Sequence, residues 1–279
     1  MSGAPLLDVR DLKVRFHLRR GTVEAVRGVS FTLGRERLGI VGESGSGKSQ
    51  TGRAILGLTP PPGEVTAERL AFDGTDLLAA SPRALRQLRG SRMTMVMQDP
   101  KYSLNPVMTV GRQMVEAYRA HVSATKAEAR EKALAMLDAV KIRDPARVLS
   151  LYPHELSGGM GQRVMIAMML VTDPDLLIAD EPTSALDVTV QLEVLRILDE
   201  LVARRGMGLI FISHDLELVS SFCDRVLVMY AGKVVEELKA ADLDKARHPY
   251  TRGLMGCLPK LDHDVHPLPT LQRDPAWAR

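Results

Sequence analysis

The stretch Arg37-Leu-Gly-Ile-Val-Gly-Glu-Ser-Gly-Ser-Gly-Lys-Ser49 decides the fold of this chain. It opens with a short apolar run, Arg37–Val41, which predicts a buried parallel strand, and it is followed by a predicted helix at Gln50–Leu58. The residues between them, Gly42–Ser49, match the pattern G-x-x-x-x-G-K-[ST], in which backbone amides wrap the phosphates of a nucleotide. The pattern also assigns Lys48 to the β- and γ-phosphates and the Ser49 hydroxyl to Mg²⁺. A chance match in a glycine- and serine-rich turn is the alternative, and the flanking strand and helix make it improbable.

The residues that we expect to line the phosphates are Gly42, Glu43, Ser44, Gly45, Ser46, Gly47, Lys48, Ser49 and Gln50.

Composition is that of an ordinary globular protein, with 279 residues, 45% apolar and 25% charged. The net charge of +3 is too small to imply a nucleic-acid partner. No apolar run approaches the ~18 residues of a membrane span, and the first residues lack the pattern of a secretory signal. Cys223 and Cys257 are too few and too far apart for a metal cluster. We therefore expect a protein of a reducing, cytoplasmic compartment.

Hydrophobic patterning predicts an α/β fold. Alternating residues at 7–16 and 29–33 indicate an antiparallel sheet near the N-terminus. Apolar runs at 93–97, 175–179, 208–212 and 225–229 alternate with helical segments at 188–204 and 216–222, which is typical of a mainly parallel sheet. Helical spacing over 110–139 indicates a helical subdomain inserted at about 100–172. We expect one domain over residues 1–262 and a short Pro-rich tail over 263–279, extended or poorly ordered.

Two carboxylates end the apolar strand Leu176–Ala179. Asp180 is placed to hold Mg²⁺ through water, and Glu181 is placed to polarise an attacking water. The alternative is a solvated acidic turn, which the phosphate loop upstream makes less probable.

A second helix start with glycines occurs at Leu156-Ser-Gly-Gly-Met160. Ser157 can cap this helix, and Gly158 and Gly159 leave its first amides open to an anion. One nucleotide needs only one such helix end at its γ-phosphate. The second end makes sense if it serves a nucleotide held by another subunit.

Two further polar residues follow predicted strands. Gln98 could sense Mg²⁺ and the attacking water from a hinge, although a solvated strand-end glutamine is the alternative. His214 could donate to the γ-phosphate, whereas a lone histidine at a strand end is more often structural. Only the neighbouring motifs favour the functional reading of both residues.

Together these motifs resemble the ATP-binding subunit of ATP-binding-cassette (ABC) transporters, from about Leu6 to Glu237 and in that family's order. The resemblance implies an ABC ATPase fold: a P-loop NTPase core, an N-terminal antiparallel β-subdomain and an inserted helical subdomain. It identifies Gly42–Ser49 as the Walker A loop, Gln98 as the Q-loop and Leu156–Gly159 as the signature segment.

The resemblance identifies Asp180 and Glu181 as the end of the Walker B strand, Ser184–Asp187 as the D-loop with Asp187 near the nucleotide, and His214 as the switch histidine. Phe16 resembles the aromatic residue that stacks on adenine, with a core phenylalanine as the alternative.

The resemblance implies an ATPase in which two such subunits dimerise head to tail, each signature segment closing over the other's ATP. Glu181 would act as base or water-orienting group, and His214 with Lys48 would stabilise charge on the γ-phosphate. Opening and closing of the dimer would rock two membrane permease subunits between inward- and outward-facing states.

Longer stretches resemble the oligopeptide, dipeptide and nickel importer branch. They are Gln98–Pro106, Tyr152–Met160, Asp180–Gln191 and His248–Leu254. In that branch two different ATPase subunits pair beneath two permeases, at the cytoplasmic face of the inner membrane, and an extracytoplasmic binding protein delivers the solute. We therefore expect a subunit of a di- or oligopeptide importer, with the permease contact around Asp99–Pro106, including Tyr102 and Leu104.

Other functions stay open at this point. They are import of nickel or another small solute, a non-transport cassette subunit such as one of a carbon–phosphorus lyase complex, and a soluble cassette protein acting on nucleic acid or ribosomes. The last usually carries two cassettes or a long coiled coil, and this sequence has neither. Gly161 stands where relatives more often carry arginine, and only Cys257 lies where some relatives hold an iron–sulfur cluster, so we predict none.

Overall fold

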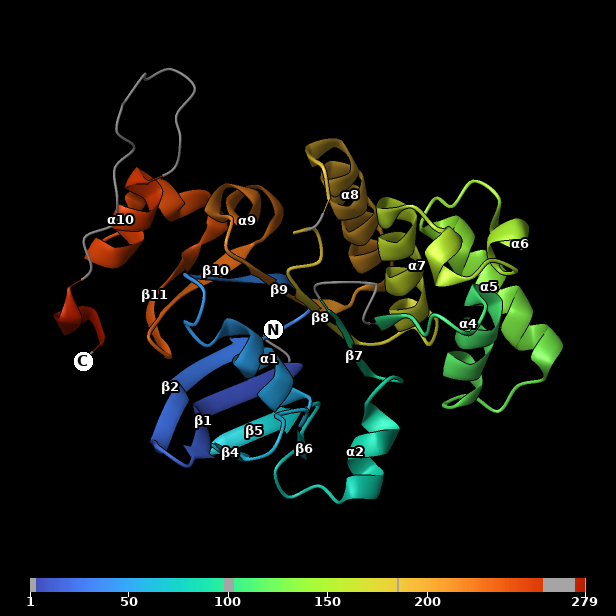
Figure 1. The fold of residues 1–279 in the computed structure, drawn as a ribbon. Helices are drawn as coiled ribbons and strands as arrows, with labels where there is room; N and C mark the ends of the chain where they lie inside the picture. The colour runs from blue at the N-terminus through green and yellow to red at the C-terminus, as the bar shows by residue number, and fades with distance from the viewer. Residues whose placement is uncertain (1–3, 98–102, 185, 258–273, 279) are drawn as a thin grey trace. The chain divides into compact units, whose positions relative to one another are not determined.

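The computed structural model describes residues 4–97, 103–184, 186–257 and 274–278. The chain divides into two compact units, the first comprising Met1–Ala79 with Phe211–Arg279 and the second Ala80–Ile210 (Figure 1). The predicted extent of one domain over residues 1–262 stays a prediction.

The strands of the first unit are β1 (Leu7–Leu18), β2 (Gly21–Leu33), β3 (Arg37–Val41), β4 (Gly63–Thr66), β5 (Arg69–Phe72), β6 (Thr75–Asp76), β10 (Arg225–Tyr230) and β11 (Lys233–Lys239). Its helices are α1 (Lys48–Ile55), α9 (Leu216–Phe222) and α10 (Pro249–Gly256), with the 3₁₀-helices η2 (Ala240–Lys245) and η3 (Pro275–Ala278). The elements of the second unit are β7 (Met93–Val96), β8 (Leu176–Asp180), α2 (Pro82–Leu88), α4 (Val110–Arg119), α5 (Lys126–Ala139), α6 (Pro145–Val148), η1 (Pro153–Glu155), α7 (Gly158–Leu170) and α8 (Val188–Arg205). Strand β9 (Gly208–Ser213) begins in the second unit and ends in the first.

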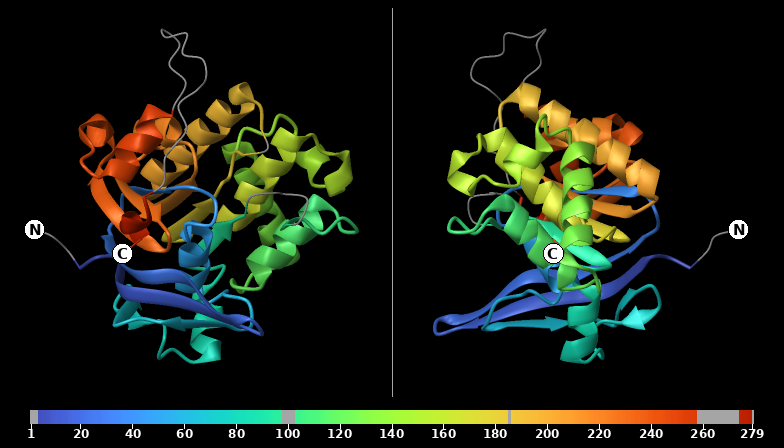
Figure 2. Two further views of the ribbon diagram at one scale, coloured as in Figure 1. Left: turned by 60° about the vertical axis from the view of Figure 1, so that its left-hand side comes forward. Right: turned by 90° about the vertical axis from the view of Figure 1, so that its right-hand side faces the viewer.

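An antiparallel sheet forms one part of the first unit, as predicted. Its strands follow the order β2-β1-β5-β6, and β4 also pairs with β1. Strands β1 and β2 form the long blue hairpin of Figures 1 and 2, closed where Leu18 faces Gly21. The apolar side chains that alternate along β1, such as Leu12 and Val14, are fully buried, which is why these residues form a strand with one wet face.

The strand before the phosphate loop lies in the other sheet of the first unit, in the order β11-β10-β3-β9. β3 runs parallel to β10, and β11 returns antiparallel along β10. Leu38, Ile40 and Val41 are fully buried, as the apolar run predicted. A side chain at Gly39 would stand 2.3 Å from Cγ1 of Val219, so the glycine is what allows α9 to pack closely on β3.

The second unit contains β9-β8-β7, with β7 and β8 parallel, and a group of helices. The predicted helical block 110–139 contains α4 and α5, and Thr125 and Glu128 build the capping box that starts α5. Helices α4, α5 and α7 pack together (Figures 1 and 2), and Met114, Ala133 and Met165 lie in their core. These helices lie within the predicted insertion, whose bounds of 100–172 stay a prediction.

Part of the tail differs from the expectation of an extended or poorly ordered segment. Residues 263–273 lie outside the described residues, whereas Pro275–Ala278 form η3. The Trp277 ring packs against Tyr230, with centroids 5.9 Å apart. Among the described residues, no helix combines the length and the hydrophobicity that crossing a bilayer requires.

Candidate functional site

The phosphate loop (Gly42–Ser49) has a backbone that needs glycine. Gly42, Gly45 and Gly47 have positive φ angles of 149°, 82° and 102°. A side chain at Gly42 would also stand 2.1 Å from the carbonyl oxygen of Met229, at the end of β10. The Ser46 amide donates to the Glu43 carbonyl oxygen at 3.1 Å and closes the turn. The loop is thus a tight turn seated directly on β10.

The loop leads into the N-terminus of α1. This helix begins at Lys48, two residues before the predicted start, and its N-cap is Gly47. Because glycine has no capping side chain, no side chain of the N-cap takes up the first amides of α1, which suits an anion. Lys48 is buried, and its Nζ donates to the carbonyl oxygens of Gly42 and Glu43 at 2.7 and 2.8 Å. Ser49 and Gln50 follow in the first turn, and Oε1 of Gln50 is buried without a hydrogen-bond partner among the described residues.

Two contacts that the sequence analysis missed hold the loop from outside. The Glu43 amide donates to the hydroxyl of Tyr250, in α10, at 3.0 Å. The Gly232 amide donates to the Ser46 carbonyl oxygen at 3.0 Å. The sequence marks His248–Leu254 only through its resemblance to the importer branch, and nothing in its residue types points to the phosphate loop.

Phe16 and His214 also belong to the first unit. Phe16 lies on β1 opposite Val23 and Gly63, and its ring is half-buried, with Cε1 close to where a side chain at Gly63 would stand. A partly exposed ring suits stacking better than a core role does. His214 directly follows β9 and is exposed, and Asp215 after it caps α9. Contact of either residue with a nucleotide stays a prediction.

The two carboxylates of the second unit differ in surroundings. Asp180 is the last residue of β8 and is buried, with 6% of its surface exposed. Glu181 is half-buried and has a φ of 47°, an unusual backbone conformation for a residue other than glycine. The amide and hydroxyl of Ser184 both donate to the Glu181 carbonyl oxygen. The turn therefore fixes the Glu181 backbone in a strained conformation, as is common at functional sites.

The signature segment starts α7, as predicted. Ser157 is the N-cap, and its Oγ accepts from the Met160 amide at 3.4 Å. A side chain at Gly158 would meet nothing within 4 Å, whereas one at Gly159 would stand 2.7 Å from Cγ1 of Val190. The first glycine of the helix thus faces open space, and the second is needed for packing against α8.

The signature helix and the acidic turn are directly connected. Gln162, one turn into α7, is buried, and its Nε2 donates to the carbonyl oxygen of Pro182. Asp187 has a structural role that the sequence analysis did not foresee, because its Oδ1 accepts from the Val190 amide at 3.0 Å and caps α8. Its contact with a nucleotide stays a prediction. Gln98, predicted as a catalytic and metal-binding residue, lies outside the described residues.

The residues present suit an Mg²⁺ ion that is bound mainly by nucleotide phosphates, and not one that is held by protein ligands alone. Among the described residues, no group of three or more His, Cys, Asp or Glu side chains could hold a metal ion. Mg²⁺ commonly keeps several waters and binds nucleotide phosphates together with one or two protein groups. The Ser49 hydroxyl and the Asp180 carboxylate are groups of this kind, and their binding of Mg²⁺ stays a prediction.

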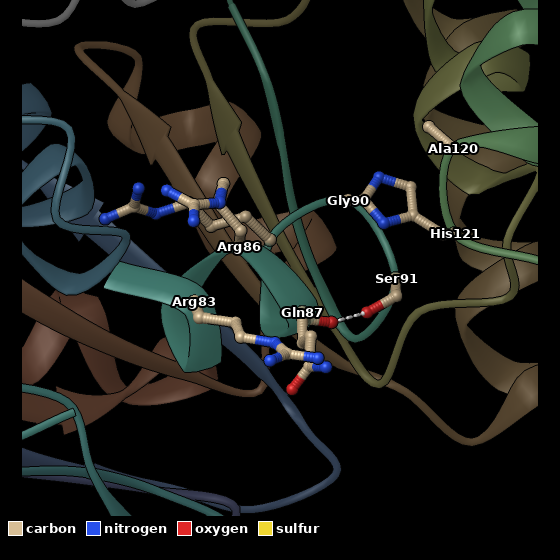
Figure 3. Close-up of a pocket in the computed structure, with 8 residues that line it drawn as sticks. Arg83, Arg86, Gln87, Gly90, Ser91, Ala120 and His121 are labelled. Carbon is tan, nitrogen blue, oxygen red and sulfur yellow. Dashed lines mark hydrogen bonds between the residues drawn. The ribbon is translucent and has the colours of Figure 1, made fainter. Parts of the chain in front are cut away.

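Described residues of the second unit line cavities of different size. One of about 360 Å³ adjoins the signature segment and is lined by Leu104, Pro106, Pro153, His154, Leu156, Ser157, Gly158 and Gly161. A wider one, of about 1030 Å³, is lined by Arg83, Arg86, Gln87, Arg89, Gly90, Ser91, Ala120 and His121. Figure 3 shows the arginines at α2 on one side of it and His121 on the other, with Ser91 bonded to the Gln87 carbonyl oxygen. The wider cavity contains none of the predicted site residues, so its size alone does not mark the nucleotide site.

Known proteins that are similar to this chain belong to the family that these motifs resemble. The family described as "ABC transporter" matches residues 26–184. A probable peptide ABC transporter ATP-binding protein of Sinorhizobium fredii is 51% identical over 91% of this chain and 77% of that protein. The dipeptide transport ATP-binding protein DppD of Haemophilus influenzae is 48% identical over 96% of this chain and 82% of that protein. The oligopeptide transport ATP-binding protein OppD of Salmonella typhimurium is 47% identical over 97% and 81%.

Solved structures show the same fold. The dimeric ATP-binding cassette MJ0796, in a post-hydrolysis state bound to ADP and Pi, superposes with a TM-score of 0.74 at 26% identity, covering 84% of this chain and 98% of that one. The cbiO1 protein of Clostridium perfringens, part of the ABC transporter complex cbiONQ, gives a TM-score of 0.74 at 28% identity, covering 87% and 92%. The matched family model and the relatives of about 50% identity agree with the motifs described above. This chain therefore belongs to the ATP-binding proteins of the ABC transporter family.

Proposed function

We propose that this chain is the ATP-hydrolysing subunit of an importer for di- and oligopeptides. The observation that carries the proposal is its similarity, at about half of the aligned positions and over more than nine-tenths of its length, to proteins named for peptide, dipeptide and oligopeptide transport. Nothing in the described residues favours nickel, another small solute or a carbon–phosphorus lyase complex over peptides.

The proposed site is shared between two ATPase subunits. Gly158 is exposed and faces open space within its own unit, so the first amides of α7 are accessible to a ligand from another molecule. The phosphates of a second nucleotide, held by the phosphate loop of a partner ATPase, would match these amides in charge. The dimeric state named for MJ0796 supports this arrangement, and the partner here would be a different chain of the same family.

Hydrolysis would use residues of both units. The loop amides and Lys48 would bind the β- and γ-phosphates, with Lys48 exchanging its bonds to the Gly42 and Glu43 carbonyls for phosphate oxygens. When bound, Mg²⁺ would neutralise charge on the phosphate oxygens. Ser49, Asp180 and Gln98 would hold it.

Glu181 would orient the attacking water and accept its proton, and its fixed backbone would keep the carboxylate from drifting. His214, which is exposed directly after β9, would donate to the γ-phosphate. Phe16 would stack on the adenine ring.

The permease contact is proposed around the cavity beside the signature segment. Leu104 and Pro106 line this cavity, and Val107 next to them is 79% exposed, an unusual exposure for an aliphatic side chain. Leu104 itself is only 4% exposed, so it would shape this surface from beneath. Tyr102 lies outside the described residues. With two permeases above it and a binding protein delivering the solute, the subunit would sit at the cytoplasmic face of the inner membrane.

The test is uptake by the complete transporter in proteoliposomes. The chain is combined with its partner ATPase, permeases and binding protein, and labelled dipeptide, pentapeptide and Ni²⁺ are offered with ATP inside. The proposal expects ATP-dependent peptide uptake that is lost in the Glu181→Gln variant. Uptake of Ni²⁺ without peptide would overturn the assignment of the solute and leave the ATPase assignment standing.

A further inference from the structure

We infer that Tyr250 is a positioning residue for the phosphate loop, and that α10 thereby tunes the affinity of this subunit for nucleotide. The inference rests on ATP binding by the loop and is independent of the transported solute. All residues involved belong to the first unit.

The inference rests on a hydrogen bond between Glu43 and Tyr250. The Glu43 amide donates to the Tyr250 hydroxyl at 3.0 Å, across 207 positions of the sequence. Tyr250 is fully buried, and its ring packs on Tyr230 with centroids 4.5 Å apart and on Trp277 at 5.9 Å. Packed rings fix where the hydroxyl lies, so the acceptor for the Glu43 amide stands at a defined point.

The helix that carries Tyr250 is itself firmly anchored. His248 caps α10 by accepting the Tyr250 amide at its Nδ1, 3.2 Å away, and Pro249 occupies the first helical position. The carboxylate of Glu236, on β11, accepts from the Arg247 amide at 2.7 Å. β11 in turn pairs with β10, on whose end the phosphate loop is seated. The loop and α10 are therefore attached to the same pair of strands.

Glu43 links this anchor to the phosphate-binding lysine. Its amide is bonded to Tyr250, and its carbonyl oxygen accepts from Nζ of Lys48 at 2.8 Å. Rotation of the peptide before Glu43 would break the first bond, and rotation of the peptide after it would break the second. By holding the amide, Tyr250 limits the conformations of the loop before nucleotide enters, and such preorganisation increases affinity.

The principal experiment compares Tyr250→Phe with Tyr230→Phe in the full-length chain. Both changes remove one hydroxyl and keep a ring in the same aromatic cluster, but only the first removes the acceptor of the Glu43 amide. Fluorescence titration with N-methylanthraniloyl-ATP should give a Kd about three- to tenfold higher for Tyr250→Phe, the range expected for one lost hydrogen bond. Tyr230→Phe should stay within about twofold of the unchanged protein.

The rate of hydrogen exchange at the Glu43 amide gives a second readout, which would not change if Tyr250 only filled space. The amide of Glu43 should exchange faster in Tyr250→Phe than in Tyr230→Phe, even when the two variants have the same melting temperature. A Kd for Tyr250→Phe equal to that of the unchanged chain overturns the inference, as does a Kd that rises equally in both variants.

The unchanged protein supplies a test that does not depend on any variant folding. If α10 tightens the loop, nucleotide must by reciprocity tighten α10. Adding ATP should slow amide exchange over residues 249–256 and alter the fluorescence of Trp277, the only tryptophan of the sequence. Unchanged exchange in α10 upon saturation with ATP would refute the coupling, whereas failure to transport peptide would leave it untouched.

Discussion

Replacing Gly158 by alanine separates the fold of the signature helix from its proposed function. A methyl group at Gly158 would meet nothing within 4 Å, and alanine is the better helix former by up to ~1 kcal/mol. The isolated variant should therefore melt at or slightly above the temperature of the unchanged chain. Its own affinity for ATP should not change, because that ATP binds at the phosphate loop.

In the assembled transporter the same methyl group would lie between the α7 amides and the partner's ATP. Loss of one well-placed hydrogen-bond donor to a reacting oxyanion costs about 2.7–4 kcal/mol, or a factor of about 10²–10³ in kcat. We therefore expect turnover of the partner's ATP, at saturating ATP, to fall at least about a hundredfold.

Gly159→Ala is the matched control, because the two changes are chemically identical and adjacent. Its methyl group would stand 2.7 Å from Cγ1 of Val190, closer than ordinary van der Waals contact. Overpacking of this kind costs about 1–3 kcal/mol, and each kcal/mol lowers the melting temperature by about 2–4 °C in a protein of this size. Calorimetry should thus separate a destabilised Gly159→Ala from an undisturbed Gly158→Ala. Full turnover by a complex carrying Gly158→Ala would refute the reasoning, since the open space beside Gly158 would then have no ligand.

Three further predictions concern single side chains. Glu181→Gln should bind ATP with unchanged affinity but hydrolyse it at least about a hundredfold more slowly and trap the closed dimer, as gel filtration with ATP would show; normal turnover would exclude Glu181 as the key carboxylate. Burial raises the pKa of Cys223 to about 12, so native protein at pH 8 should react with a maleimide at the half-buried Cys257 and not at Cys223. Denatured protein should react at both cysteines. Mass spectrometry of the labelled peptides checks this, and labelling of Cys223 in the native protein would contradict it. The hydrogen bond from Arg37 lowers the pKa of Asp224, so its stabilising effect is complete above the ordinary value of about 3.9 and disappears as the pH falls through the lower folded-state pKa. Asp224→Asn should accordingly lower the melting temperature at pH 7, by an amount that shrinks as the pH falls below about 3.9, and a loss that does not change with pH would contradict this reasoning.

The parts of the fold that the sequence predicted are those with strong local signals. The apolar runs of β3, β8 and β9 and the glycine pattern of Gly42–Ser49 were recognisable because each fixes its local conformation almost alone. The start of α1 was placed two residues late because its cap is a glycine in a left-handed conformation, which leaves no capping side chain to recognise. The short elements α2 and β4–β6 were missed because few residues carry their periodicity.

The missed parts of the candidate site depend on contacts between distant residues. The bond between Glu43 and Tyr250 joins a loop to a helix that follows it by more than two hundred positions. The packing of Gly159 against Val190 depends on how α7 meets α8, which neither helix encodes by itself. Asp187 is the opposite case, because its contact is local. It caps α8, and an aspartate directly before a helix predicts such a cap, but the motif was interpreted only in terms of the nucleotide.

The parallel pairing of β3 with β10 has a consequence for how this protein is made. Arg37, at the start of β3, is held by Asp224, 187 positions later in the chain. Ribosomes add about 5–20 residues per second, so β3 waits roughly 10–40 s before its neighbour strand exists. Met229, on which the phosphate loop is seated, is made later still. During synthesis β3 therefore lacks this neighbour for many seconds, and the phosphate loop cannot reach its final conformation, or ATP help the chain to fold, before Met229 has been made.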